Sequence, residues 1–252
     1  MVMRQIRWDK DSYLSKLRLG KGSKEVVVFG NSLARDLQYG VSTIFNDVIG
    51  NLSVIAAGHC SPYMAKYAQK TLFCDEKCLK HCFDYERQIL NILKEWPTPI
   101  DIIIVQHSYG EFKRLPYNPN DEPQQIIQNF YSQLESIARE AVILPYAEVW
   151  APSEFTVYMK RLAFLDGVIS SSDKRQRNET EIINKRIEDI KCRKCIKIDY
   201  SKLVCHKNGR CNFSSPNGTL YYVDHLHTTM YHSLTYAERI RQRYDEFLMN
   251  NE

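Results

Sequence analysis

Three residues far apart in the chain have the types and spacing of a nucleophilic site. Ser32 follows a β-branched run and a glycine, and it stands where a helical pattern begins. A hydroxyl at such a turn lies beside the partial positive charge of a helix amino end. Asp224 and His227 stand three residues apart near the other end of the chain, a spacing that lets the carboxylate orient the imidazole and the imidazole accept the serine proton. The alternative is that Ser32 or Asn31 is simply a helix cap.

The other candidates lie where predicted strands end. The patterns predict strands at 25–29, 52–57, 99–105, 141–145 and 195–200, and helices at 32–48, 83–96, 123–140, 155–165, 179–190 and 233–249. Strands that alternate with helices predict an α/β fold with a mostly parallel sheet covered on both faces. Ligands bind at the carboxyl ends of such strands. We therefore expect the segments 30–32, 58–60, 106–108 and 223–227, which include Ser32, Gly58, Gln106, His107 and Ser108, to lie at one edge of the sheet.

Two short motifs resemble sequence blocks of the SGNH hydrolase family. Phe29-Gly30-Asn31-Ser32-Leu33 resembles the first block, usually Gly-Asp-Ser, and Asp224-His225-Leu226-His227 resembles the final Asp-x-x-His block. The resemblance covers about Val26 to Phe247 and implies a flavodoxin-like three-layer sandwich. It implies Ser32 as nucleophile, His227 as base and Asp224 as the orienting acid. His225 does not fit this block, because the residue three positions before it is Tyr222. His225 and His232 are therefore interpreted as ordinary surface or capping histidines.

The oxyanion hole is where the chain departs from that family. Gly58 stands at the position of the family's Gly block, and the Cys60-Ser61-Pro62 that follows resembles carboxyl-terminal SGNH domains attached to membrane O-acyltransferases. The third block of the family is usually Gly-x-Asn-Asp, whereas this chain has Val105-Gln106-His107-Ser108. Asn31 replaces the family's Asp, and His232 replaces a helix-opening Gly. The expected oxyanion donors are the backbone N–H groups of Ser32 and Gly58, with Gln106 or His107 in place of the usual Asn.

The resemblance implies serine-dependent O-acyl transfer or ester hydrolysis through an acyl-enzyme on Ser32, with no metal and no cofactor. It implies an acylated small molecule or carbohydrate as substrate, and a carbohydrate or other hydroxyl at a membrane as acceptor. The implied partner is a covalently attached membrane acyltransferase domain, so that residues 1–252 are expected to be a single SGNH-like domain excised from a longer protein. Two alternatives stay open: a free-standing acetylesterase, and an SGNH-fold binding module with little or no turnover. Tyr63 and Tyr109 are candidates for lining a sugar or acyl pocket.

Composition argues against other classes of protein. The 252 residues are 44% hydrophobic and 25% charged, which is typical of a globular chain with one large core. The 34 Lys and Arg against 30 Asp and Glu leave a net charge of +4, too small and too scattered to predict nucleic-acid binding. No apolar run approaches the roughly 18 residues of a membrane-spanning helix, and the first residues lack the apolar region of a signal peptide.

The cysteines indicate an oxidising compartment. They form four groups: Cys60; Cys74, Cys78 and Cys82; Cys192 and Cys195; Cys205 and Cys211. With N-glycosylation sequons at Asn51, Asn178, Asn212 and Asn217, they predict disulfides, a glycoprotein and the lumenal or extracellular side of a membrane in the secretory pathway. At most one disulfide is expected within the group of three. One alternative is a zinc site of Cys192, Cys195, Cys205, His206 and Cys211, but the spacing of the second pair is too long for a zinc knuckle. The other is unpaired structural cysteines.

Overall fold

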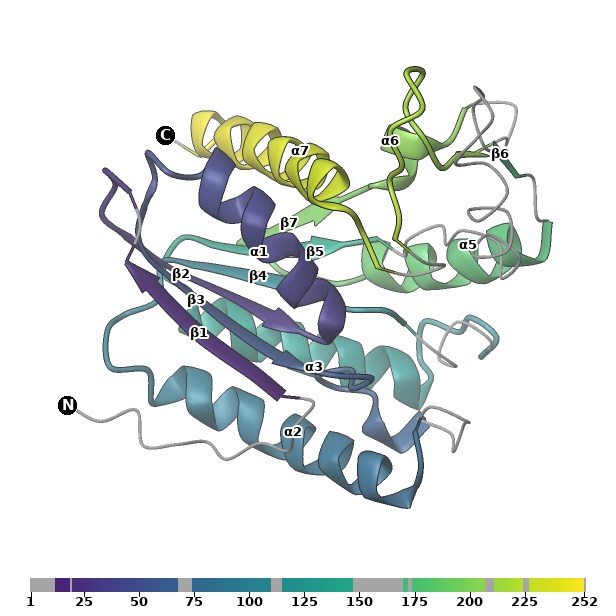
Figure 1. The fold of residues 1–252 in the computed structure, drawn as a ribbon. Coiled ribbons are helices and arrows are strands. Elements are labelled where there is room, and N and C mark those ends of the chain that lie inside the picture. Colours follow the sequence, from purple (N-terminus) through teal and green to yellow (C-terminus); the bar gives the residue numbers. More distant parts are fainter. Residues whose placement is uncertain are drawn as a thin grey trace.

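A computed structural model describes residues 12–18, 20–67, 74–109, 115–146, 170–171, 174–206, 211–223 and 227–251. Its central layer is a six-stranded sheet in the order β1-β3-β2-β4-β5-β7 (Figure 1). The strands are β1 (Ser12–Arg18), β2 (Lys24–Gly30), β3 (Ile49–Ala57), β4 (Ile102–Gln106), β5 (Ala141–Pro145) and β7 (Cys195–Ile198). All neighbours pair in parallel except β1, which runs antiparallel to β3. The predicted α/β fold with a mostly parallel sheet is confirmed.

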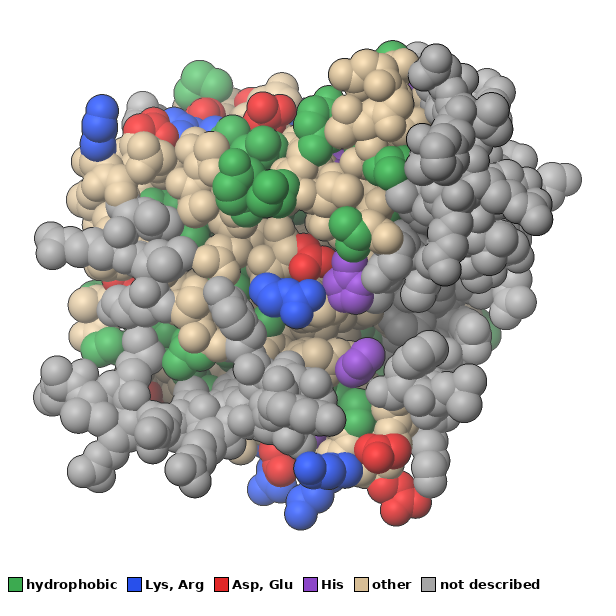
Figure 2. All heavy atoms as spheres, viewed as in Figure 1, with side chains coloured by type: hydrophobic (Ala, Val, Ile, Leu, Met, Phe, Trp, Pro, Cys, Tyr) green, Lys and Arg blue, Asp and Glu red, His purple; other side chains and the backbone are tan. Residues whose placement is uncertain are grey.

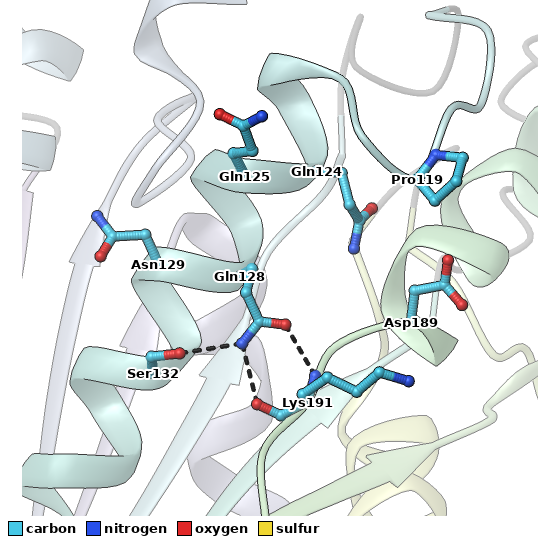
Figure 3. A pocket seen from close by; sticks show the side chains of 8 residues that line it. All are labelled: Pro119, Gln124, Gln125, Gln128, Asn129, Ser132, Asp189 and Lys191. Atoms are coloured by element: carbon cyan, nitrogen blue, oxygen red, sulfur yellow. Dashed lines mark hydrogen bonds between the residues drawn. The ribbon is translucent and has the colours of Figure 1, made fainter.

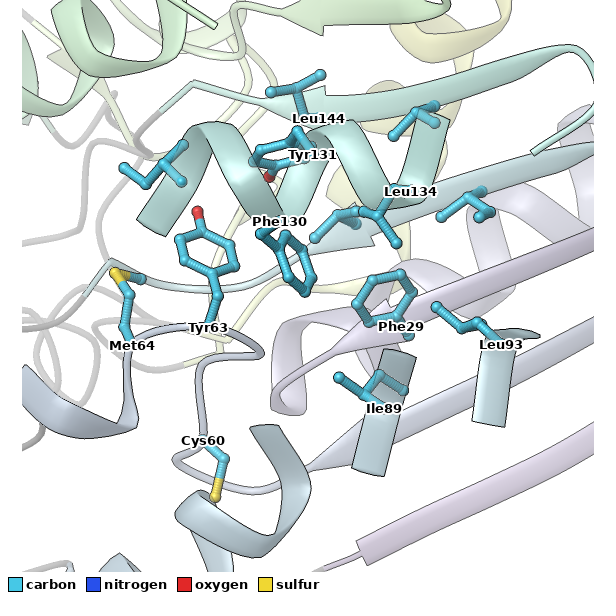
Figure 4. Close-up of a cluster of buried hydrophobic side chains, with 14 of the residues drawn as sticks. Phe29, Cys60, Tyr63, Met64, Ile89, Leu93, Phe130, Tyr131, Leu134 and Leu144 are labelled. Carbon is cyan, nitrogen blue, oxygen red and sulfur yellow. The ribbon is translucent and has the colours of Figure 1, made fainter. Parts of the chain in front are cut away.

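Helices cover both faces of the sheet because successive strand side chains point to opposite faces. Val26 and Val28 belong to the core under α1 (Ser32–Ile44) and α7 (Met230–Met249). Val27 and Phe29 belong to the core under α2 (Glu76–Lys94), α3 (Glu122–Ile137) and α5 (Lys174–Glu188). Figure 4 shows this second core, in which the rings of Phe29 and Phe130 lie edge to face with centroids 6.2 Å apart. The result is a three-layer sandwich.

Several elements differ from the sequence prediction. No strand is predicted before residue 25, yet β1 pairs with β3 along its whole length. As an antiparallel edge strand it lacks the β-branched run of a strand buried on both faces. Helix α2 begins before the predicted residue 83 because Asp75 caps it, accepting a hydrogen bond from the Cys78 N–H at 2.9 Å. The predicted helix at 155–165 lies outside the described residues. Unpredicted short elements are η1 (Ala65–Tyr67), α6 (Ser201–Val204), β6 (Ser170–Ser171) and β8 (Cys211–Asn212).

Four disulfides link all eight cysteines: Cys60–Cys82, Cys74–Cys78, Cys192–Cys195 and Cys205–Cys211. The predicted disulfides are thus confirmed, with one bond inside the group of three. Because both cysteine pairs of the zinc alternative are disulfide-bonded, that alternative is not the arrangement found here. Among the described helices, none has the length and apolar character needed to cross a membrane.

Candidate active site

The turn between β2 and α1 presents Ser32. Gly30 has φ +154, and a Cβ there would lie 1.8 Å from the backbone oxygen of Gln106, so only glycine fits between the two strands. Asn31 is the N-cap of α1, and its side-chain Oδ1 accepts a hydrogen bond from the Leu33 N–H at 3.0 Å. The capping role therefore belongs to Asn31. Ser32 is the first helical residue and is partly exposed, and its hydroxyl is left for another partner.

That partner is His227. Its Nε2 lies 2.9 Å from Ser32 Oγ, although the two residues are 195 positions apart in the chain. A base within hydrogen-bond reach of a hydroxyl can accept its proton, so this pair has the geometry that nucleophilic catalysis requires. The predicted contact between these two side chains is present. Asp224 and His225 lie outside the described residues.

Backbone bonds and one threonine hold His227 in place. The Val223 N–H donates to the His227 carbonyl oxygen at 2.9 Å, and the Thr229 N–H donates to Tyr221 at 2.9 Å. Thr229 is also the N-cap of α7, and its hydroxyl donates to the carbonyl oxygen of Leu220 at 2.8 Å. One side chain thus fixes both the start of α7 and the segment that leads to His227, a role that the sequence analysis missed.

A second carboxylate, also missed, lies near His227. Asp36 stands one helical turn after Ser32 on α1, and only 11% of its side chain is exposed. Burial raises the pKa of its carboxyl, while nearby His227, Arg35 and the Thr228 N–H act in the opposite direction. Residues four apart lie on one side of a helix, so the offset of Asp36 from Ser32 is the sequence signal that could have predicted this acid near the site. The segment around His227 therefore packs against a buried acid.

The predicted side-chain donors to the oxyanion are deeply buried. Gln106 ends β4 opposite Gly30 and is 2% exposed, and His107 is 1% exposed. The Nδ1 of His107 lies 2.9 Å from the Ser108 carbonyl oxygen, and its Nε2 lies 3.0 Å from the Tyr63 hydroxyl. A carbonyl oxygen only accepts, so Nδ1 carries the proton and Nε2 accepts from Tyr63. Burial lowers the pKa of His107 to about 4, which keeps the ring neutral at physiological pH.

The loop after β3 carries Gly58 into the same region. His59 has a positive φ of 62°, a strained conformation for a non-glycine residue, and the next residue, Cys60, is bonded to Cys82 of α2. Ser61 then donates to the Ser108 carbonyl oxygen at 3.0 Å. The loop is thus attached both to α2 and to the end of β4.

Two aromatic candidates lie in the core instead of lining an open pocket. Tyr63 is 2% exposed and Tyr109 is 3% exposed, and the Tyr109 hydroxyl donates to the Pro145 carbonyl oxygen at 2.7 Å. Exposed apolar side chains do flank His227 in the sequence: Val223 is 59% exposed and Met230 is 65% exposed. Figure 2 shows a histidine, an acidic and a basic side chain gathered near the centre of one face, with apolar side chains close by.

Two grooves in the described structure lie away from Ser32 and His227. The larger, about 710 Å³, runs between α3 and the segment after α5 (Figure 3). Within it Gln128 donates to the Lys191 carbonyl oxygen at 2.9 Å and accepts from the Lys191 N–H at 2.8 Å. A second, about 440 Å³, is lined by Cys192, Cys195 and residues of β7 and α7. Neither groove includes the Ser32–His227 pair.

Comparison with known families identifies the fold. Residues 6–242 match the family model described as SGNH domain (fused to AT3 domains), where AT3 stands for acyltransferase 3. The chain belongs to the SGNH domain family. No curated protein matches the sequence significantly.

Two solved structures resemble this SGNH domain. The periplasmic domain of the lipopolysaccharide acetyltransferase from Salmonella ser. Paratyphi A is 14% identical, with a TM-score of 0.59 over 90% of this chain and 85% of that one. A Bacteroides fragilis protein provisionally called an acylhydrolase is 17% identical, with a TM-score of 0.47 over 92% of this chain and 91% of that one. At these identities the first likeness is one of fold.

Proposed function

We propose that this SGNH domain catalyses serine-dependent O-acyl transfer or ester hydrolysis through an acyl-enzyme on Ser32. The observation that carries the proposal is the 2.9 Å contact between Ser32 Oγ and His227 Nε2 at the end of a buried strand. The family assignment of residues 6–242 supports the same class of reaction. Neither a metal nor a cofactor enters the steps below.

In the first half-reaction His227 Nε2 accepts the Ser32 proton while Ser32 Oγ bonds to the ester carbonyl carbon. The carbonyl electron pair moves onto oxygen, where the N–H groups of Ser32 and Gly58 would stabilise the negative charge. The intermediate then expels the alcohol, which takes the proton from His227. Asp224 would hold the imidazole in the required orientation, as the acid of the Asp-x-x-His block.

In the second half-reaction an acceptor hydroxyl replaces the departed alcohol. His227 removes its proton, the hydroxyl oxygen bonds to the acyl carbon, and Ser32 leaves with the proton returned by His227. If water takes this place the outcome is hydrolysis, as in a free-standing acetylesterase. The exposed Val223 and Met230, which flank His227 in the sequence, would provide apolar surface for the acyl chain or acceptor.

The family description favours a membrane acyltransferase as the partner, because its SGNH domains are fused to AT3 domains. Such a partner would deliver the acyl donor, and the name of the Salmonella relative favours a carbohydrate acceptor. The four disulfides favour the lumenal or extracellular side of a membrane. N-glycosylation at the four sequons fits the same side and stays a prediction.

The test is hydrolysis of 4-nitrophenyl acetate, followed by transfer of the acetyl group to an added carbohydrate. The purified chain should release nitrophenol, and the S32A variant should release none above the uncatalysed rate. Acetylated carbohydrate in the product would distinguish a transferase from an esterase. If the folded chain shows no turnover with any short-chain aryl ester, the enzyme proposal fails and the binding module replaces it.

A further inference from the structure

The end of β4 lies directly beside the nucleophile turn. Gly30 of β2 pairs with Gln106 of β4, so the residues that follow each strand leave the sheet side by side. There Asn31 Nδ2 donates a hydrogen bond to Ser108 Oγ at 2.9 Å. Because Asn31 immediately precedes Ser32 and its Oδ1 is fixed by the Leu33 N–H at 3.0 Å, this bond ties the Ser108 hydroxyl to the turn that presents the nucleophile.

Ser108 also touches the loop that carries the other expected donor. Its carbonyl oxygen accepts from Ser61 Oγ at 3.0 Å, and Ser61 lies in the loop that follows Gly58. The Cys60–Cys82 disulfide anchors that loop to α2. Ser108 is therefore held between the turn that provides the Ser32 N–H and the loop that provides the Gly58 N–H.

The two residues that precede Ser108 are poorly placed to donate to a substrate. The ring nitrogens of His107 lie within hydrogen-bond distance of the Ser108 carbonyl oxygen and the Tyr63 hydroxyl, at 2.9 and 3.0 Å. Gln106 is the last strand residue and is almost fully buried. Ser108 is partly exposed, so a ligand at the sheet edge can reach it.

We infer that the Ser108 hydroxyl is the side-chain donor to the oxyanion, oriented by Asn31; this inference rests on the proposed function. A serine hydroxyl that accepts one hydrogen bond still has its own proton to donate. Because Ser108 Oγ accepts from Asn31, that proton is available to the oxygen that becomes negative as Ser32 attacks. Hydrogen bonds in a chain polarise one another, so the bond from Asn31 makes the Ser108 hydroxyl a stronger donor. Ser108 acts on the reacting oxygen, and Asn31 is a positioning residue.

The first experiment compares S108A with the wild type in 4-nitrophenyl acetate hydrolysis. Loss of one oxyanion donor typically lowers kcat by about 100- to 1000-fold. We expect a loss in that range with little change in KM, because the donor acts mainly in the transition state. S108T keeps the hydroxyl and should retain activity to within a few-fold. Ser136→Ala removes an exposed hydroxyl on α3 and should leave kcat unchanged.

The second experiment tests the role of Asn31. In N31D the carboxylate can still accept from the Leu33 N–H, so the cap of α1 is kept. It cannot donate to Ser108, and it draws the Ser108 hydroxyl proton toward itself instead. We expect kcat to fall by at least tenfold with an unchanged melting temperature, and we expect N31D to cause little further loss when Ser108 is already alanine. A role confined to capping predicts full activity in N31D.

Labelling of Ser32 by a fluorophosphonate separates the two proposals. A wild-type chain that is neither labelled nor active would overturn the proposed function. A labelled, active wild type with S108A and N31D both within threefold of its kcat would overturn the role of Ser108 alone. If S108A does not fold, the kcat of N31D relative to the wild type decides whether Ser108 is the donor, because N31D keeps the cap of α1 and is expected to fold.

Discussion

The strand–turn–helix unit that presents Ser32 belongs to the core, whereas the segment that presents His227 packs at the edge of that core. Residues Val26 to Phe29 are completely buried, and α1 joins α7 where the Gly40 N–H donates to Ser233 Oγ at 3.0 Å. Residues 211–223 and 227–229 instead pair through the short strand β8 and through single bridges such as Tyr222↔Thr228. They are held further by the Cys205–Cys211 disulfide and by the hydroxyl of Thr229.

This difference shows that a site can be formed from two parts of the chain when only one of them belongs to the buried core. Ser32, the proposed nucleophile, is fixed by the same contacts that stabilise the fold. His227, the proposed base, lies in a segment fixed by a few hydrogen bonds and ring contacts, which include Tyr221 stacked on His232 at a centroid distance of 4.7 Å. Substitutions in the His227 segment should therefore reduce activity more than stability, and the following variants test that expectation.

The largest effect is expected from H227A. Removing the base of a serine nucleophile costs on the order of 10⁴-fold or more in kcat. The side chain is only partly buried, so the melting temperature should change little. Steady-state kinetics and thermal unfolding check both points, with H81A on α2 as the matched control. Equal activity in H227A and H81A would contradict the assignment of the base.

The next variants separate the two acids near His227. D224N should lower kcat by roughly 10⁴-fold if Asp224 orients the imidazole. D36N removes only a neighbouring charge and should cost on the order of tenfold, or about 1.4 kcal/mol of barrier. If the two losses are reversed in size, Asp36 is the orienting acid.

A substitution at Thr229, the N-cap of α7, tests whether that cap holds His227 in position. T229V removes the hydroxyl that caps α7 and bonds to Leu220, and should cost about 1 kcal/mol of unfolding free energy. We also expect a loss of about tenfold in kcat, because a small displacement of His227 disturbs proton transfer. D75A removes the equivalent cap of α2 and should match the stability cost without the kinetic one. Equal kinetics in the two variants would show that the cap does not position His227.

The last prediction concerns His232 and the pH dependence of stability, with no effect expected on catalysis at neutral pH. This side chain is 1% exposed, and burial lowers its pKa to about 3 from an ordinary value of 6.5. As the pH falls below 6.5 the unfolded chain binds a proton that the folded chain does not, so stability decreases until the pH nears the folded pKa. Between pH 7 and pH 5 this loss is about 2 kcal/mol. The H232F variant keeps an aromatic ring that cannot titrate. Its unfolding free energy, measured in urea, should fall by about 2 kcal/mol less than that of the wild type between pH 7 and pH 5. An equal fall in both proteins would contradict the role of His232.

Much of the fold follows from local patterns in the sequence. Buried β-branched runs mark the central strands, and the glycine that ends β2 marks the turn that presents Ser32. The edge strand β1 carries no such run, since its stability comes from pairing with β3. The contact between Ser32 and His227 could be predicted because each residue lies in a local motif. The buried state of His107 could not, because it depends on Tyr63, a partner 44 residues away in the chain. Ser108 could be predicted to lie just after a strand, but its hydrogen bond to Asn31 could not, because that bond depends on the register between β2 and β4.

The most direct test of the central claim is the intact mass of the chain after treatment with a fluorophosphonate, followed by peptide mapping. A serine activated by His227 should gain the mass of one phosphonyl group on Ser32, and the S32A variant should gain none. Under the same conditions H227A should react far more slowly. A folded wild-type chain that stays unlabelled, or one that is labelled at another residue, would contradict the account.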